Sequence, residues 1–205
     1  MNSAKFITFE GIEGVGKSTN MAHLTSILEE RGHEVLTTRE PGGTPMAEKI
    51  RELLIEHGEE PMPEIAELLL MFASRSLHVS NVIKPALAAG TWVVCDRFTD
   101  ASRAYQGGGR GIPLDDINQL ARWVMGDLKP DMTILLDAPV ETGMSRAGQR
   151  GDPDRFEVER SEFFSRARDT YLQLAAAEPE RFVIVDATQD LAAVQDDITK
   201  IAKDL

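Results

Sequence analysis

The chain has 205 residues, 42% of them hydrophobic, and a formal net charge of −12, from 34 acidic and 22 basic residues. This length suits one ordinary domain with a sizeable core, and the acidic balance disfavours binding to nucleic acid or to anionic membranes. The single cysteine excludes an intrachain disulfide framework, and no signal peptide or membrane span is predicted. We therefore expect one cytoplasmic domain over 1–205.

The first predicted element is a strand over 6–10, and it leads into the run Gly11-Ile12-Glu13-Gly14-Val15-Gly16-Lys17-Ser18-Thr19. The spacing from Gly11 to Gly16, Lys17 and Ser18 is that of a phosphate-binding loop between a strand and a helix. Backbone N–H groups and the helix start bind phosphate, the lysine neutralises the β- and γ-phosphates, and the hydroxyl ligates Mg²⁺. The sequence therefore predicts nucleoside triphosphate binding by residues 11–19.

Further strands and helices alternate along the rest of the chain. We expect strands at 35–38, 91–95, 132–136 and 182–185. Helices are expected after the loop to Gly32, near 47–57, 64–89 and 114–125, from 140, and at 161–177 and 191–203. Apolar strands that alternate with helices predict a parallel sheet covered on both faces. The fold class is therefore α/β, a three-layer sandwich of the P-loop NTPase type with a five-stranded parallel sheet.

Two polar stretches have no predicted element. Residues 99–111 are rich in glycine, and we interpret the glycines at 107–109 as giving backbone freedom. Residues 146–157 are charged and interrupted by glycine and proline, as in a mobile lid. Cys95 lies in an apolar run and is interpreted as a packed core thiol. The four histidines, which lack metal-ligand spacing, are interpreted as solvated or half-buried surface residues.

Charged residues mark the carboxyl ends of the predicted strands. They are Glu10, Arg39, Asp96, Arg97, Asp137 and Asp186. In parallel α/β sheets, ligands bind beyond these ends, so we expect several of these side chains to face the ligand. The alternative is that the acids cap the turns that follow the strands.

Four sequence blocks together resemble one family. They are the phosphate loop, Thr38-Arg39-Glu40-Pro41-Gly42-Gly43, Asp96-Arg97-Phe98, and Ala104-Tyr105-Gln106-Gly107-Gly108-Gly109-Arg110-Gly111. In this order they are similar to the bacterial thymidylate kinases, and the resemblance covers essentially the whole chain. It implies transfer of the γ-phosphoryl group of ATP to dTMP, giving dTDP, with Mg²⁺ as cofactor. It also implies a homodimer, which we expect to form chiefly through the helix around 68–83.

The resemblance assigns roles residue by residue. To Lys17 of the phosphate loop it adds Arg97 and Arg150 as catalytic residues, with Arg150 as the lid arginine. To Ser18 of the loop it adds Asp96, which would help to hold Mg²⁺ directly or through water. It implies contacts to dTMP from Glu13, Arg39, Glu40, Arg51, Phe72, Arg75, Arg97, Ser102, Tyr105 and Gln106. In the family, the aromatic residue that stacks on thymine commonly stands four positions before the base-reading arginine. Here that position is Met71, and Phe72 lies three before Arg75.

Other interpretations remain open from the residues. The chain could be another nucleoside monophosphate kinase, or a nucleotide-dependent switch or motor. A switch that uses GTP normally carries an Asn-Lys-x-Asp motif, which is absent, and the net charge argues against a motor on nucleic acid. Arg146, Arg150 and Arg155 could also form a solvated segment paired with the acids at 152, 154 and 157.

Overall fold

The protein is described by a computed structural model that covers residues 4–56, 60–148 and 155–205. Five parallel strands form one sheet in the order β2-β3-β1-β4-β5. The strands are β1 (Phe6–Glu10), β2 (Val35–Arg39), β3 (Trp92–Asp96), β4 (Met132–Asp137) and β5 (Phe182–Asp186). The predicted five-stranded parallel sheet is confirmed, and β2 to β5 each extend one residue further than expected, to the charged residue at the carboxyl end.

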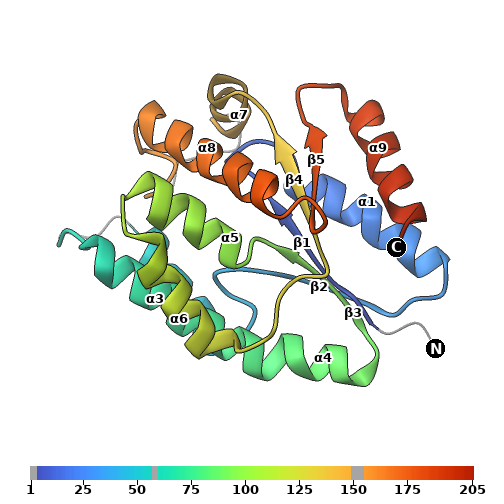
Figure 1. The fold of residues 1–205 in the computed structure, drawn as a ribbon, viewed down its shortest axis with the longest axis horizontal. Helices are drawn as coiled ribbons and strands as arrows, with labels where there is room; N and C mark the ends of the chain where they lie inside the picture. Colours follow the sequence, from blue (N-terminus) through green and yellow to red (C-terminus); the bar gives the residue numbers. More distant parts are fainter. Residues whose placement is uncertain (1–3, 57–59, 149–154) are drawn as a thin grey trace.

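Helical segments connect the strands (Figure 1). They are α1 (Lys17–Glu30), α2 (Pro45–Ile55), α3 (Glu64–His78), the π-helical η1 (Val79–Ile83), α4 (Lys84–Ala89), α5 (Thr99–Ser102), the π-helical η2 (Arg103–Gly109), α6 (Leu114–Met125), α7 (Val140–Ala147), α8 (Ser161–Ala177) and α9 (Leu191–Lys203). The predicted long helix over 64–89 is observed as α3, η1 and α4 in succession.

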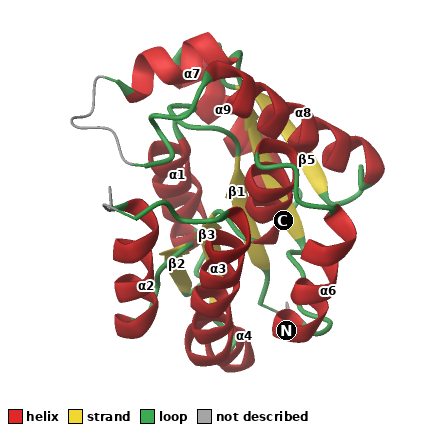
Figure 2. Ribbon diagram, turned by 90° about the vertical axis from the view of Figure 1, so that its left-hand side faces the viewer, coloured by secondary structure: helices red, strands yellow, loops and turns green. Residues whose placement is uncertain are grey.

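Helices cover both faces of the sheet, as predicted. Figures 1 and 2 show α1 and α9 together on one side, with α3, α6 and α8 on the other. Side chains of β1 alternate between these layers, because successive residues of a strand point to opposite faces. Ile7 and Phe9 belong to the core cluster that contains Leu24 of α1, whereas Phe6 belongs to the cluster built on α3 and α6.

The glycine-rich stretch that follows β3 is helical. Residues 99–109 form α5 and η2, and Gly107, Gly108 and Gly109 do not have positive φ angles. A Cβ atom at Gly108 would lie 2.2 Å from Thr170 Oγ1, and one at Gly109 would lie 2.4 Å from the Phe163 ring. The interpretation of these glycines as sources of backbone freedom was therefore wrong: they allow η2 to pack closely against α8.

The cysteine and the histidines divide into confirmed and corrected predictions. Cys95 is buried, and burial raises the pKa of its thiol, which confirms a core thiol. His23 and His33 are half-buried, as expected, but His78 is fully buried, contrary to the prediction. His57 lies outside the described residues. Within the described ranges, no helix is long and apolar enough to cross a membrane.

Candidate active site

The turn between β1 and α1 has the shape of a phosphate-binding loop. Gly11, Gly14 and Gly16 have φ angles of 134°, 74° and 91°, which residues with a side chain rarely adopt. Lys17 folds back over this loop, and its Nζ donates to the carbonyl oxygens of Gly11 (3.3 Å) and Ile12 (3.1 Å). Burial, followed by the neighbouring Arg97, lowers the pKa of Lys17. A phosphate group placed here would relieve this repulsion between cations.

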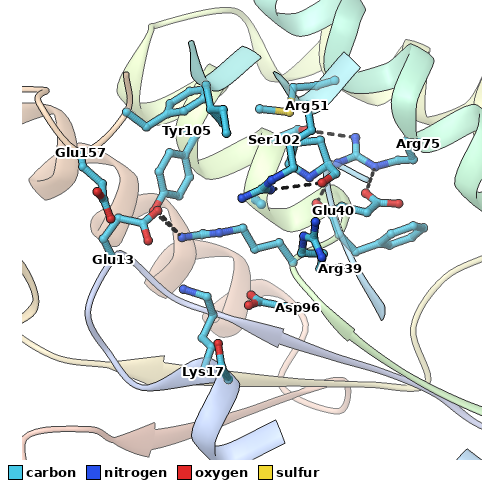
Figure 3. A pocket seen from close by; sticks show the side chains of 18 of the residues that line it. Glu13, Lys17, Arg39, Glu40, Arg51, Arg75, Asp96, Ser102, Tyr105 and Glu157 are labelled. Carbon is cyan, nitrogen blue, oxygen red and sulfur yellow. Dashed lines mark hydrogen bonds and ion pairs between the residues drawn. The ribbon is translucent and has the colours of Figure 1, made fainter. Parts of the chain in front are cut away.

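The loop lies at one end of a cavity of about 210 Å³ (Figure 3). Five of the residues predicted to bind the triphosphate line it: Glu13, Gly14, Gly16, Lys17 and Ser18. Gly11, Ile12 and Val15 are buried beneath the loop, and Thr19 is exposed on α1. The cavity continues past the ends of β2 and β3 to α3 and η2, so the sheet edge predicted from the strand-end residues is where the cavity lies.

Arg97 stands at the centre of the cavity in a strained backbone conformation. Its φ angle of 67° is the only positive one among the described residues other than glycine. Nη1 donates to the Gly11 carbonyl (2.9 Å), and Nη2 donates to Glu13 Oε1 (2.6 Å) and to the Tyr105 hydroxyl (3.0 Å). Burial lowers the pKa of Arg97, but Glu13 raises it, and the net pKa lies well above the ordinary value.

Asp96 and Ser18 provide oxygen atoms on the α1 side of the cavity. Asp96 Oδ1 is buried and has no hydrogen-bond partner among the described residues. The part of the chain that the structure describes contains no cluster of three or more metal-ligating side chains. Magnesium, however, usually binds one or two protein oxygens and completes its coordination with water and phosphate. An unpaired carboxylate oxygen in a cavity that a serine residue also lines therefore fits the predicted Mg²⁺ ligands.

A second buried arginine, Arg75 of α3, forms the opposite end of the cavity. Its Nε donates to Glu40 Oε2 at 2.6 Å, Nη1 to Ser102 Oγ at 3.0 Å and Nη2 to the Phe98 carbonyl at 3.0 Å (Figure 3). A guanidinium group carries five N–H bonds, so two remain after these contacts. The structure thus brings Arg75 and Ser102 together, as the resemblance implied for the residues that read the base.

The neighbouring aromatic residue differs from the prediction. Phe72 is 3% exposed and belongs to the core cluster of α3 and α6, and its ring packs on the Arg75 guanidinium at 4.7 Å. Met71 lines the cavity, whereas Phe72 does not. The placement of Phe72 against the substrate is corrected: α3 turns Met71 toward the cavity and Phe72 toward the core.

Glu40, which the resemblance implied as a contact to dTMP, lines the cavity. Both of its carboxylate oxygens are bound within the protein. Oε2 accepts from Arg75, and Oε1 is 3.0 Å from His78 Nδ1. Arg39 and Arg51 line the cavity beside it. Arg39 pairs with Glu48 at 2.7 Å, and Arg51 donates to the Pro41 carbonyl at 3.1 Å.

Tyr105 and Gln106 of η2 form the upper wall of the cavity. The Tyr105 ring makes edge contacts with Phe156, Phe163 and Phe164. Gln106 is 1% exposed, and its Nε2 donates to Glu67 Oε1 at 2.9 Å. This contact fixes the orientation of the Gln106 amide group, because its N–H₂ end is held by the carboxylate.

Glu67 of α3 joins several segments around this wall. Besides Gln106, its carboxylate binds Arg110 Nη2 at 3.1 Å and Arg155 Nη2 at 2.8 Å. Arg155 Nε also donates to the Leu54 carbonyl at 2.7 Å. Arg155 is therefore a structural ion-pair partner and does not form part of a solvated segment. Arg146 donates to the Ala187 carbonyl at 2.7 Å. Arg150 and half of the predicted lid, residues 149–154, lie outside the described residues.

The strand-end acids separate into two groups. Asp96 lines the cavity, together with Arg39 and Arg97, as the favoured interpretation expected. Glu10, Asp137 and Asp186 instead have structural partners.

Glu10 accepts from Tyr171 Oη at 2.6 Å, Asp137 binds Arg168 at 2.7 Å, and Asp186 accepts from the Thr188 N–H at 2.8 Å. Burial, and secondly Asp100, raise the pKa of Glu10 to about 7. These three acids do not line the cavity, so the expectation that several strand-end residues face it holds for Arg39, Asp96 and Arg97 alone among the six.

Sequence reasoning did not single out two residues that build the site: Glu67 and His78. Glu67, Met71, Arg75 and His78 recur at spacings of three and four, and such residues share one face of a helix. This spacing was a usable signal, because it places polar residues on the face of α3 that carries Met71 and Arg75 to the cavity.

Comparisons with known proteins agree with this geometry. A family model described as Thymidylate kinase matches residues 9–198. The chain is 54% identical over 200 residues to a thymidylate kinase of Ectopseudomonas mendocina, covering 98% of this chain and 95% of the relative. It is 57% identical over 190 residues to one of Pseudomonas savastanoi pv. phaseolicola, covering 93% and 90%. A crystal structure of thymidylate kinase from Ehrlichia chaffeensis matches with a TM-score of 0.79 and 34% identity, over 98% of this chain and 99% of the other.

Proposed function

The chain belongs to the thymidylate kinase family, and from that premise we propose how its residues share the work of the reaction. The chain transfers the γ-phosphoryl group of ATP to dTMP, giving dTDP and ADP. The alternatives of another monophosphate kinase or of a switch are not favoured. The observation that carries the assignment of roles is one cavity that holds both the phosphate loop and the Arg75–Glu40–Ser102 group.

The phosphate end neutralises the charge of the transferred group. Phosphoryl transfer depends mainly on positioning and on electrostatic stabilisation, and the acceptor phosphate is itself the nucleophile. We assign Lys17 to the β- and γ-phosphates of ATP. Arg97, in the middle of the cavity, lies between the donor and acceptor phosphates. Arg150 stays a prediction from the resemblance as a further cation.

Magnesium is the proposed metal cofactor, held by Asp96, directly or through water, and by the Ser18 hydroxyl. When bound, it would neutralise charge on the ATP phosphates. The unpaired and buried Asp96 Oδ1 supports this assignment. Asp96 is also the last residue of β3, so its backbone is held within the sheet.

The base end recognises thymine. The two remaining N–H bonds of Arg75 suit the O4 acceptor of thymine. Cytosine has an amino group at the same place, which would set one hydrogen-bond donor against the N–H donors of Arg75. Ser102 accepts from Arg75 and can itself donate or accept at the base edge. Buried polar groups left unpaired by the wrong base make such sites strongly selective. Tyr105, packed against three aromatic rings, would resist a 2′-hydroxyl group on the sugar.

A panel of nucleoside monophosphates with ATP and Mg²⁺ tests this function. We expect diphosphate to form from dTMP with a kcat/KM at least about 10²-fold above that for dCMP. Without an acceptor, ATP hydrolysis should be slow. Equal kcat/KM for dTMP and dCMP would show that the roles of Arg75 and Ser102 are wrong, and hydrolysis that ignores dTMP would overturn the kinase assignment.

We also propose a homodimer, with a corrected interface. Leu68, Val79 and Ile83 of the predicted interface are buried within the protomer. The exposed apolar side chains on α2 and α3 are Met46, Leu53, Ile65 and Leu69, each more than 50% exposed. We expect Leu69→Glu to shift the sedimentation of the protein toward the monomer. Leu191→Glu, an equally exposed site on α9, should leave it unchanged. A cytoplasmic location stays a prediction.

A further inference from the structure

A fully buried imidazole lies next to the base end of the cavity without lining it. His78 is the last residue of α3, is 0% exposed, and follows Arg75 by three positions, so both side chains leave the helix on one face. The reaction as proposed does not use it. A buried polar ring at the junction of α3 with a π-helical segment is a costly feature, and such junctions are frequent at functional sites.

His78 is the middle of a chain of hydrogen bonds that ends at Arg75. Its Nε2 lies 2.7 Å from Thr38 Oγ1, and its Nδ1 lies 3.0 Å from Glu40 Oε1. The other oxygen of Glu40, Oε2, accepts from Arg75 Nε at 2.6 Å. Each carboxylate oxygen of Glu40 thus has one partner on α3, and rotation of the carboxylate about its own axis would break both contacts.

The turn that carries Glu40 is packed directly on the imidazole. A Cβ atom at Gly43 would lie 2.4 Å from His78 Cδ2, so only glycine lets the turn approach this closely. Gly42 N–H donates to Ser74 Oγ of α3 at 3.1 Å. The ring of His78 therefore helps to set the position of the turn after β2 relative to the helix that carries Arg75.

We propose that His78 is a positioning residue for base recognition. It donates from Nδ1 to Glu40, and Glu40 in turn fixes the direction in which the guanidinium of Arg75 presents its two remaining N–H bonds. Thr38 fixes the ring from its other nitrogen. The inference rests on the proposed function, because it assumes that Arg75 reads the base of the acceptor nucleotide.

Two substitutions separate the two nitrogens of the ring. In His78→Asn, the side-chain amide lies where Nδ1 was and can still donate to Glu40, whereas contact with Thr38 is lost. In His78→Gln, the amide lies nearer the position of Nε2, so the Thr38 contact is kept and the donor to Glu40 is lost. His23→Gln is a matched control, because His23 Nε2 binds Thr199 Oγ1 at 2.9 Å between α1 and α9, outside the cavity lining.

The readouts are the Kd of dTMP by calorimetry without ATP, the KM of each substrate, kcat and Tm. We expect His78→Gln to raise the Kd and KM of dTMP about tenfold, as for loss of a hydrogen bond to a buried charge, with kcat and the KM of ATP within about twofold. His78→Asn should stay within about threefold of the parent in dTMP affinity. His23→Gln should match the parent in every binding constant.

Three outcomes would overturn the inference. One is a folded His78→Gln protein with the dTMP affinity of the parent. Another is an equal loss in both His78 variants that extends to ATP, which would indicate a merely structural role. If neither variant folds, Thr38→Val decides, and an unchanged dTMP Kd there would overturn the inference, whereas a rise of about threefold would support it. A parent protein that forms no dTDP would instead refute the proposed function.

Discussion

The two ends of the cavity hold their cations in different ways. At the phosphate end, Lys17 is bound by the carbonyl oxygens of its own loop, and Arg97 by a loop carbonyl, a carboxylate and a tyrosine hydroxyl. At the base end, Arg75 has a buried carboxylate, a hydroxyl and a carbonyl on three different segments. Arg75 is thus neutralised within the protein, whereas Lys17 has no carboxylate hydrogen-bonded to it in the described structure.

Because of this difference, one cavity can serve both the chemical step and the recognition of the base. Neutral carbonyl partners leave the positive charge of Lys17 in place, and a phosphate can replace them at little cost. Three of the five N–H bonds of Arg75 are already bound to Glu40, Ser102 and the Phe98 carbonyl, so two remain for a base. The phosphate end supplies charge to the reaction, and the base end supplies a fixed direction for recognition.

Removing the cation of the phosphate end should have the largest effect. We expect Lys17→Ala to lower kcat by about 10³-fold or more, because charge on the transferred group loses its neutralising partner. The Tm should stay near that of the parent. Stopped-flow or steady-state assays of dTDP formation measure the effect. Lys200→Ala, at an exposed lysine on α9, is the control. Near-normal turnover in a folded variant would remove the contrast between the two ends.

Changing the shape of the cation at the base end should weaken the recognition of dTMP and leave the rate of the chemical step nearly unchanged. Arg75→Lys keeps the charge opposite Glu40, but an ammonium group cannot reach Glu40, Ser102 and the Phe98 carbonyl together. We expect kcat/KM for dTMP to fall about 10²-fold, nearly all of it in KM, and the preference over dCMP to shrink. Arg31→Lys, on the surface, is the control. An unchanged ratio of dTMP to dCMP would count against the assignment.

A smaller effect is expected from the packing beneath the phosphate loop. A Cβ atom at Gly143 of α7 would lie 2.4 Å from the Glu13 carbonyl oxygen, and one at Gly14 would lie 1.8 Å from the Gly143 carbonyl oxygen. Gly143→Ala should displace the loop and lower kcat/KM for ATP about tenfold, with dTMP binding nearly unchanged. At Gly148, a new Cβ would meet its nearest atom at 3.5 Å, so Gly148→Ala should resemble the parent. Equal behaviour of the two variants would show that the loop does not depend on this contact.

The last prediction concerns stability and the residue between the two ends. Glu10 accepts from the Phe98 N–H and from Tyr171, whose hydroxyl also accepts from Arg97. The pKa of Glu10 is raised to about 7 from 4.5, so between these pH values the folded state holds more protons than the unfolded state, and stability falls as the pH rises. Glu10→Gln removes this titration. The Tm of Glu10→Gln minus the Tm of the parent should therefore increase by about 5 °C from pH 5 to pH 8. A constant difference in Tm between the two proteins would refute the shift.

Much of the fold could be predicted because its signals are local. The boundaries predicted for α6, α8 and α9 match the structure, since each helix has a clear apolar period bounded by residues that end it. The phosphate loop was predictable for the same reason: its spacing is a property of consecutive residues. The strands were recognised from their apolar runs, but the polar last residues of β2 to β5 were missed, and β3 was predicted to begin one residue too early.

The errors share one physical cause, which is a partner distant in sequence. The packing role of Gly108 depends on Thr170, and the burial of His78 depends on Thr38 and Glu40. The direction of Phe72 depends on which face of α3 meets the core. The nearest neighbours of these residues along the chain carry no trace of such contacts. The resemblance placed Glu40 at the site, but its two partners on α3 became visible only in the fold.

The buried carboxylate of Glu67 has a consequence for how this protein can vary in sequence. Its partners Gln106, Arg110 and Arg155 come from one π-helical segment, the turn after it and the chain that follows residue 154. Exchanging Glu67 alone would remove the carboxylate that Gln106, Arg110 and Arg155 share, and the loss of a buried ion-pair partner typically destabilises a protein by several kcal/mol. Tolerated changes would therefore have to arrive together, and the effects of single and paired substitutions at these positions would not add. We therefore expect the four positions to change together in sequence, although the first and the last of them, 67 and 155, lie 88 positions apart in the chain.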